Sequence, residues 1–196
     1  MIAYVNGIVT YKDPAYAIID VNGVGYEVRI SLQTYTSLPD IGARCKLVTF
    51  LNIREDAHVL YGFWGNDEKK LFLDLTSISG IGPSTALVML SSLSSSEIRQ
   101  GIIDEDLRLI QSIKGIGSKT AQRVILELRD KIRKEELVST GPKSVEASSS
   151  TLRSEALAAL VTLGIPKATA EKSLDAIIKR EGQSISVENL IKLALR

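Results

Sequence analysis

The feature that most constrains this chain is a nine-residue motif that occurs twice, with an offset of 35 residues. Residues 78–86 (ISGIGPSTA) and 113–121 (IKGIGSKTA) share Ile, Gly, Ile, Gly, Thr and Ala at matching positions. Each copy follows one stretch of helical periodicity and precedes another. Similarity at a fixed offset indicates two copies of one supersecondary unit, which here is a helix, a short hairpin and a second helix.

Both hairpins have a chemistry that suits phosphate. Paired glycines (Gly80 and Gly82, Gly115 and Gly117) allow positive φ angles and a close approach of the backbone to a bound group. The amides at the start of the next helix point outward with the helix dipole behind them, which favours an anion. One copy alone is explained equally well as a tight turn, whereas two matched copies favour a sequence-independent grip on DNA phosphates.

The predicted phosphate-binding set contains the hairpin residues and the polar or basic residues that follow them. Its members are Gly80, Ile81, Gly82, Ser84, Gly115, Ile116, Gly117, Ser118, Lys119 and Arg123.

Charge along the chain is sorted and shows no overall excess. The net charge is +1, with 24 Lys and Arg against 23 Asp and Glu, which is less basic than many nucleic-acid binders. Residues 114–134 hold seven bases against two acids, and residues 97–106 hold one base against four acids. The base-rich run covers the second hairpin and the helix after it.

Residues 1–64 are expected to form a small closed barrel. Strand patterns cover residues 16–21, 25–30, 45–53 and 58–63. Asn22-Gly23 is a preferred two-residue hairpin turn, and a charged tip at residues 54–57 joins the second pair of strands. About five short strands bury little surface and leave open edges unless the sheet closes on itself.

The rest of the chain shows helical periodicity. It covers residues 67–77, 83–91, 94–101, 104–111, 118–134, 151–163, 167–181 and 186–195. A Ser-rich segment without an apolar face predicts a flexible linker over residues 135–150. The expected fold is therefore α+β and multidomain, with a barrel in residues 1–64, an all-α domain with tandem helix-hairpin-helix units in 65–134 and a small three-helix bundle in 151–196.

Two enzyme readings are weaker. The segment 115–120 (GIGSKT) lacks the two glycines of a nucleotide P-loop, since Ile113 and Ser118 occupy those positions. It also resembles the hairpin of helix-hairpin-helix DNA glycosylases, in which Lys119 would be the nucleophile. Those enzymes need a later aspartate and usually four cysteines, and Cys45 is the only cysteine here. A lyase or glycosylase, or a general duplex-binding scaffold, stays as an alternative.

Other candidate residues have commoner structural explanations. His58 has no Cys or Asp cluster near it in sequence, so no metal site is expected. Tyr61 and Trp64 are aromatic residues at a barrel edge, which pack more often than they stack on bases. The single cysteine excludes an intramolecular disulfide. No apolar stretch reaches the roughly 18 residues of a membrane span, and no signal peptide is recognisable, so a cytoplasmic protein is expected.

The combination of these features resembles the RuvA family of Holliday-junction recognition subunits. The residues that carry the resemblance are Met1-Ile2, the tip at 54–57 (REDA) with 60–63 (LYGF) after it, both hairpins, the linker and the turn at 163–165 (LGI). The resemblance implies an oligonucleotide-binding (OB) type barrel, a tandem helix-hairpin-helix domain and a mobile C-terminal domain. It also implies a fourfold homotetramer that holds a four-way DNA junction. Either one tetramer or two, which together form an octamer, would hold the junction.

The resemblance also implies roles and partners. Glu55 and Asp56 match an acidic pin at the junction centre, and Arg54 would contact the crossover. The C-terminal domain would bind the RuvB ATPase motor. In that domain, Leu160, Leu163 and Ile165 form either an exposed apolar patch for a partner or part of the core of the last bundle, and the sequence leaves both open. The RuvC resolvase would be a further partner in recombination and repair. No catalysis and no cofactor are implied, although some relatives hold a monovalent cation with hairpin carbonyls.

The chain departs from the family at the hairpins. Many relatives carry a lysine where this chain has Ser84 and a second basic residue where it has Ser118. Serine donates a hydrogen bond but supplies no charge. A shallower salt dependence of DNA binding is expected than for a relative with the lysine.

Overall fold

The computed structural model describes residues 1–139, 147–181 and 185–195, and the chain divides into two compact units between residues 139 and 140. The first unit contains the barrel and the helices through both hairpins. The second contains the last three helices. The α+β architecture expected from the sequence is confirmed, with an N-terminal barrel, a helical middle part and a C-terminal helical bundle.

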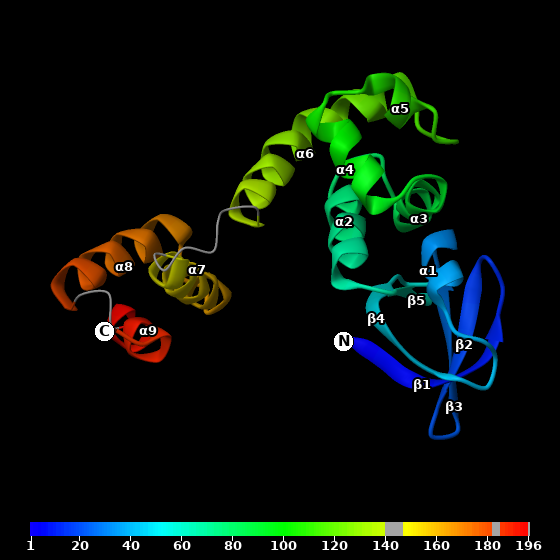
Figure 1. The fold of residues 1–196 in the computed structure, drawn as a ribbon, viewed down its shortest axis with the longest axis horizontal. Helices are drawn as coiled ribbons and strands as arrows, with labels where there is room; N and C mark the ends of the chain where they lie inside the picture. Colours follow the sequence, from blue (N-terminus) through cyan, green and yellow to red (C-terminus); the bar gives the residue numbers. More distant parts are fainter. Residues whose placement is uncertain (140–146, 182–184, 196) are drawn as a thin grey trace. The chain divides into compact units, whose positions relative to one another are not determined.

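Five strands form a closed barrel in the order β1-β2-β3-β5-β4 (Figure 1). They are β1 (Tyr4–Lys12), β2 (Tyr16–Val21), β3 (Val24–Ile30), β4 (Arg44–Ile53) and β5 (His58–Phe63). Neighbouring strands pair antiparallel except β3 and β5, whose parallel pairing places Arg29 opposite Tyr61. Alternate side chains point inward, and Val9, Ile19 and Leu47 are fully buried in the barrel core.

A short helix, α1 (Leu32–Ser37), lies between β3 and β4 in the chain and contacts the helical part. Sequence periodicity did not indicate it. Ser31 caps it, because its side chain accepts a hydrogen bond from the Thr34 amide. The hydroxyls of Ser31 and Thr34 both donate to the buried carboxylate of Glu68, Thr34 at 2.7 Å. Two charge-assisted hydrogen bonds offset the cost of burying this carboxylate and fasten α1 to the helix that carries Glu68.

The helical part of the first unit shares its core with the barrel. Its helices are α2 (Asn66–Thr76), α3 (Pro83–Ser92), α4 (Ser95–Ile103), α5 (Leu107–Gln111) and α6 (Ser118–Ser139). Phe72 of α2 packs against two aromatic rings of β5, with ring centroids 5.2 Å from Tyr61 and 4.9 Å from Phe63. The hydrophobic core therefore continues from the barrel into the helices across the change from strand to helix after Phe63.

The second unit consists of α7 (Ala147–Thr162), α8 (Lys167–Glu181) and α9 (Val187–Ala194). Helices occupy residues 135–139 and 147–150, which belong to the segment predicted as a linker, so that prediction is wrong at both ends. Residues 135–137 are Glu, Glu and Leu, good helix formers that let α6 continue. Residues 140–146 lie outside the described part of the chain. No helix in the described part is long and apolar enough to cross a membrane.

The turn between α7 and α8 repeats part of the hairpin motif. Residues 164–170 (GIPKATA) match the Gly-Ile and Thr-Ala positions of residues 80–86 and 115–121. Gly164 has a φ angle of 92°, and the amide of Ala170 donates to the carbonyl of Pro166 at 3.0 Å. The amide of Ile165 donates to the carbonyl of Leu160 at 3.0 Å, which closes the end of α7 in a Schellman motif.

Candidate DNA-binding surfaces

The two hairpins of the first unit have the same backbone geometry. Gly80 and Gly115 lie in the left-handed region, with φ angles of 96° and 89°. Ile81 donates from its amide to Ile78 at 3.0 Å, and Ile116 donates to Ile113 at 3.1 Å. The sequence repeat is thus a structural repeat, in which α2–α3 and α5–α6 are equivalent helix-hairpin-helix units.

The second glycine of each pair has a different role from the first. Gly82 has an extended backbone, with φ −86° and ψ 170°, and is the N-cap of α3. Of the two properties expected of the paired glycines, Gly82 therefore uses the close approach and not the positive φ. A Cβ atom added at Gly82 or Gly117 would meet no atom within 4 Å. At these positions glycine leaves open the space from which a ligand would approach the helix amides.

The first turn of each following helix offers unpaired amides. Ala86 and Ala121 begin the helical ladders, with amides that donate to Gly82 and Gly117 at 3.0 and 2.9 Å. The amides of the residues before them, such as Ser84 and Ser118, have no carbonyl four residues earlier within the helix. Both serines are exposed. Each hairpin therefore presents amides and a hydroxyl on one open surface.

Two residues of the predicted set face the core. The side chains of Ile81 and Ile116 are buried, with exposed fractions of 4% and 6%. Their side chains anchor the hairpins in the shared core, so only their backbone atoms are left to contact DNA.

Basic side chains distinguish the second hairpin. Lys119 is exposed in the first turn of α6. Arg123 lies one turn later and donates from Nη1 to the carbonyl of Ser79 at 3.0 Å, while its Nε lies 3.6 Å from Glu127. Arg123 therefore connects the helix of the second hairpin with the residue that precedes Gly80. The structure brings the two copies of the motif together at this point.

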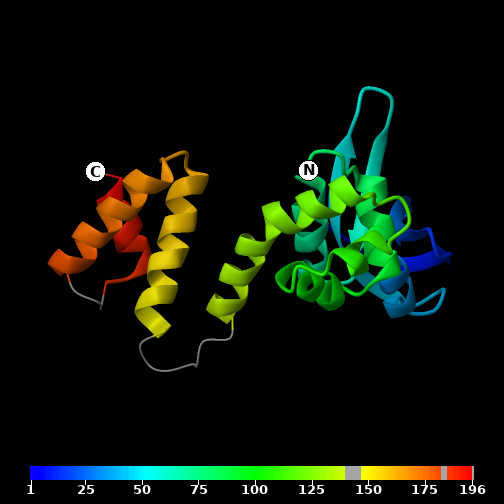
Figure 2. The ribbon, with the colours of Figure 1, turned by 90° about the horizontal axis from the view of Figure 1, so that it is seen from above.

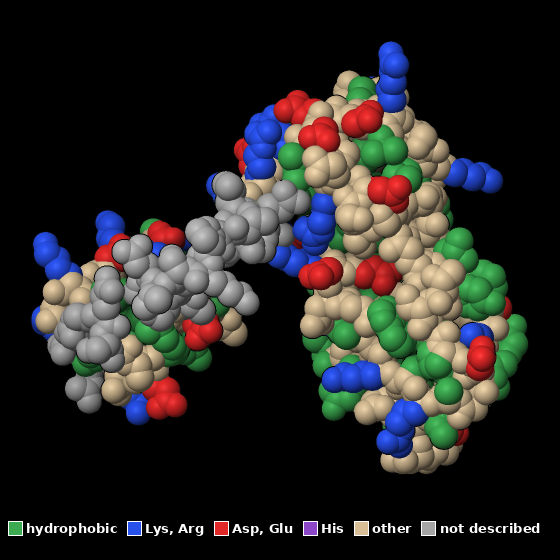
Figure 3. All heavy atoms as spheres, viewed as in Figure 1, with side chains coloured by type: hydrophobic (Ala, Val, Ile, Leu, Met, Phe, Trp, Pro, Cys, Tyr) green, Lys and Arg blue, Asp and Glu red, His purple; other side chains and the backbone are tan. Residues whose placement is uncertain are grey.

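Part of the basic run along α6 has structural partners. Lys131 forms an ion pair with the buried carboxylate of Asp74 in α2, and Arg129 pairs with Glu105 at 2.6 Å. In the face shown in Figure 3, basic side chains lie along α6, and acidic side chains gather over the end formed by α4 and α5. The charge sorting of the sequence is therefore also present in space.

The predicted acidic pin is the tip of the β4–β5 hairpin. Arg54, Glu55 and Asp56 are exposed, and the amide of Arg54 donates to the carbonyl of Ala57 at 2.9 Å to close the turn. Figure 2 shows this hairpin standing out from the barrel. Ile53 at its base is 64% exposed. An apolar side chain and two carboxylates held away from the core are available to a partner molecule.

The predicted motor-binding patch is not a single exposed surface. Leu160 is fully buried in the core of the second unit, and Ile165 packs partly against that core, whereas Leu163 is 62% exposed. Leu160 is buried because it lies on the inner side of α7 together with Ala156. Of the three predicted side chains, only Leu163 is exposed and available for contact with a partner.

A small barrel with an exposed acidic hairpin, joined to two equivalent helix-hairpin-helix units, defines a class of proteins that bind the DNA backbone irrespective of sequence. Comparisons with known proteins narrow the class. Family models match for the RuvA N-terminal domain at residues 1–62, the SAM-like helix-hairpin-helix tandem at 72–130 and the RuvA C-terminal domain at 151–196. The chain belongs to the RuvA family.

Similar proteins extend over the whole chain. A protein of Cytophaga hutchinsonii is 52% identical over 198 residues, covering 100% of this chain and 99% of the relative. One of Amoebophilus asiaticus is 51% identical and covers 100% of both, and one of Christiangramia forsetii is 44% identical with 100% and 99% covered. Each of these relatives is named Holliday junction branch migration complex subunit RuvA.

Proposed function

We propose that this protein binds four-way (Holliday) DNA junctions and acts as the non-catalytic DNA-recognition subunit of a branch-migration complex. The observation that carries the proposal is the pair of equivalent hairpins within one compact unit, joined by the Arg123–Ser79 hydrogen bond. Two phosphate sites at a fixed spacing suit the backbone of a duplex arm. The names of the full-length relatives support the same function.

The preference for a junction is assigned to the acidic tip. Glu55 and Asp56 are exposed on a hairpin that stands away from the barrel. On a continuous duplex, these carboxylates would repel the phosphates and oppose close approach. At the open centre of a junction they would lie between the separating strands. Repulsion from the wrong partner thus gives selectivity to a grip that is otherwise non-specific.

The assembly is part of the proposal. A fourfold homotetramer would bring eight carboxylates to the junction centre, and a second tetramer would form an octamer around the DNA. The C-terminal unit would bind the RuvB ATPase, which would supply the motor activity, and RuvC would act on the same complex. The protein itself would need no cofactor for binding and would work in the cytoplasm.

Gel-shift competition tests the proposed function. A labelled four-way junction bound to the full-length protein is challenged with unlabelled junction or unlabelled linear duplex of the same total length, at one salt concentration. We expect the junction to compete at a concentration at least tenfold lower than the duplex. Equal competition would refute junction recognition and would leave a general duplex-binding scaffold.

A second assay addresses the lyase alternative. If Lys119 were a nucleophile, borohydride would trap a covalent adduct between the protein and DNA that contains an abasic site. We expect no adduct with the wild-type protein. An adduct that disappears in Lys119→Gln would contradict a purely binding role.

A further inference from the structure

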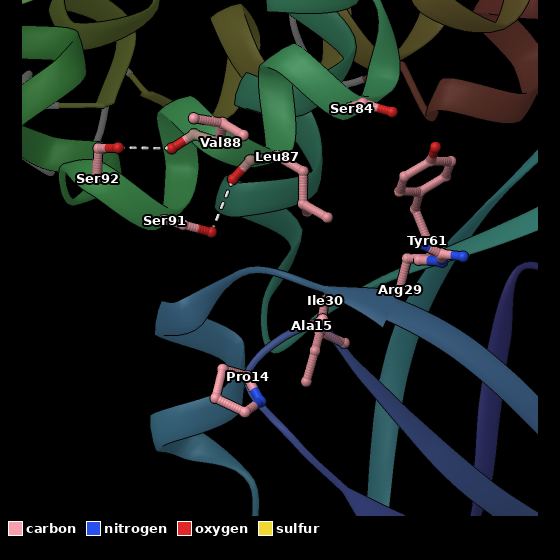
Figure 4. Close-up of a pocket in the computed structure, with 10 residues that line it drawn as sticks. All are labelled: Pro14, Ala15, Arg29, Ile30, Tyr61, Ser84, Leu87, Val88, Ser91 and Ser92. Carbon is pink, nitrogen blue, oxygen red and sulfur yellow. Dashed lines mark hydrogen bonds between the residues drawn. The ribbon is translucent and has the colours of Figure 1, made fainter. Parts of the chain in front are cut away.

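A cleft of about 300 Å³ lies between the barrel and the helix of the first hairpin (Figure 4). The barrel contributes the segment before β2, the end of β3 and Tyr61 of β5, and α3 contributes one face from Ser84 to Ser92. The ten described residues that line the cleft include one base and no acid. The cleft opens beside the predicted phosphate-binding turn, because Ser84 belongs both to its lining and to the first turn of α3.

Tyr61 supplies a polar group for which the described residues offer no partner. Its side chain is 6% exposed, and its ring packs against Phe72. Among the described residues its hydroxyl has no hydrogen-bond partner. Figure 4 shows this hydroxyl directed from β5 toward the start of α3, where Ser84 lies. A solvent-accessible hydroxyl directed into an open cleft can donate to a ligand there, because no other described residue engages it.

Arg29 supplies the positive charge of the cleft. It is the cross-strand partner of Tyr61 in the parallel β3–β5 pair. Its side chain is 54% exposed, and its Nε lies 3.9 Å from Glu27, whose side chain is 58% exposed. Exposed pairs at this separation contribute little, so the guanidinium is available to another anion. Strand alternation in the sequence indicates only that Arg29 faces solvent and does not reveal its neighbours.

We propose that this cleft seats one backbone phosphate of a DNA arm, with the Arg29 guanidinium, the Tyr61 hydroxyl and Ser84 as its ligands. The barrel then provides the charge that the first hairpin lacks at Ser84. Guanidinium is suited to this role because its planar fork of donors matches phosphate oxygens. The inference rests on the proposed DNA-binding function and adds a contact from the barrel to the contacts of the helical part.

The test measures the affinity of the full-length protein for a 25-base-pair duplex and for a four-way junction at several salt concentrations. Arg29→Ala is expected to weaken binding to both DNAs about tenfold and to reduce the slope of log affinity against log salt by about 0.9. Tyr61→Phe keeps the ring in the core and is expected to lose about fivefold in affinity with an unchanged slope. The double variant should lose less than the product of the two effects, since both groups bind one phosphate.

Arg44→Ala is the matched control, because Arg44 is an exposed arginine of the barrel that does not line the cleft. Thermal unfolding of each variant shows whether the fold is retained. A slope for Arg29→Ala equal to that of the wild type or of Arg44→Ala would overturn the proposal, as would full affinity of Tyr61→Phe. If the wild type still prefers the junction in either case, only the phosphate seat is refuted. A wild type without that preference refutes the proposed function instead.

Discussion

Arg123 donates a hydrogen bond from Nη1 to the carbonyl oxygen of Ser79 at 3.0 Å, across 44 residues of sequence. This contact links the helix of the second hairpin to the residue that precedes the first. It therefore adds a direct link between the two hairpin turns, whose Ile81 and Ile116 also share one hydrophobic core. A guanidinium carries further donors after this bond is made, so Arg123 can also contact DNA.

Two substitutions of Arg123 distinguish the effect of its charge on DNA binding from the effect of its planar guanidinium. Arg123→Ala is expected to weaken duplex binding about tenfold and to lower the salt slope by about 0.9. Arg123→Lys should keep most of the slope and still lose affinity, because an ammonium lacks the planar fork. Fluorescence anisotropy titrations in increasing salt measure both quantities. Glu127→Gln, which removes only the exposed partner at 3.6 Å, should behave like the wild type, and a loss equal to that of Arg123→Ala would contradict this account.

The glycines of each hairpin are expected to respond differently to alanine. Gly80→Ala and Gly115→Ala place a Cβ at a positive φ and should lower the free energy of unfolding by about 1 kcal/mol each. Gly82→Ala and Gly117→Ala meet no atom within 4 Å, so stability should change little while DNA affinity falls. Denaturant unfolding and gel shifts on the four variants check the pattern. Unchanged DNA binding in Gly82→Ala and Gly117→Ala would show that the open space is not used.

Ser84→Lys tests the first hairpin directly. A lysine at this position adds a charge next to the predicted phosphate, so the salt slope should become steeper by about 0.9. Ser37→Lys adds the same charge at an exposed serine of α1 and should change the slope less. Isothermal titration calorimetry or fluorescence anisotropy at four salt concentrations gives the affinities from which the slope is calculated. An unchanged slope for Ser84→Lys would place the phosphate elsewhere.

Neutralising the acidic tip should reduce selectivity rather than affinity. For Glu55→Gln/Asp56→Asn, we expect binding to linear duplex to rise severalfold and the ratio of junction to duplex affinity to fall, because the repulsion from duplex phosphates is removed. Competition assays give the ratio. Asp67→Asn/Glu188→Gln removes two exposed acids from other parts of the described chain and should leave the ratio intact. A ratio that stays unchanged in the tip variant would assign selectivity to another feature.

The capping box of α4 predicts a pH effect on stability. Hydrogen bonds from the Ser94 hydroxyl and amide lower the pKa of Glu97 below its ordinary value of 4.5. A lowered folded-state pKa adds stability that is present above pH 4.5 and is lost as the pH falls through the folded pKa. Ser94→Ala should therefore lower the melting temperature by about 2–4 °C at pH 7 and by less at pH 3. An equal loss at both pH values would contradict this coupling.

Sequence patterns predicted most of the fold because turns, strands and helix hairpins are each determined by residues that are close together in the chain. The Asn22-Gly23 turn, the alternating strands and the hairpin repeat all correspond to observed elements. The six-residue helix α1 was missed because it is too short for periodicity to register. Closure of the barrel depends on the parallel β3–β5 pairing, a long-range contact that no local pattern encodes.

The candidate site was predicted less completely than the fold. The sequence identified both hairpins and the acidic tip as segments, but it could not show that Ile81 and Leu160 face a core or that Arg123 bridges the hairpins. Arg29 and Tyr61 become neighbours only through strand register, so their cleft could not be predicted. The binding roles of these residues stay predictions that the experiments above address.

The turn between α7 and α8 has the backbone bend of the two hairpins but not their full glycine pair. Gly164 keeps the left-handed φ of Gly80 and Gly115, but Pro166 stands where those hairpins have their second glycine. Proline has no amide hydrogen, and its ring occupies the space that Gly82 leaves open. The chain thus carries its own internal control, a turn of the same left-handed glycine type that lacks the second glycine. Among these three turns, the residue two positions after the left-handed glycine is therefore the difference that we expect to separate a purely structural turn from a phosphate-binding one.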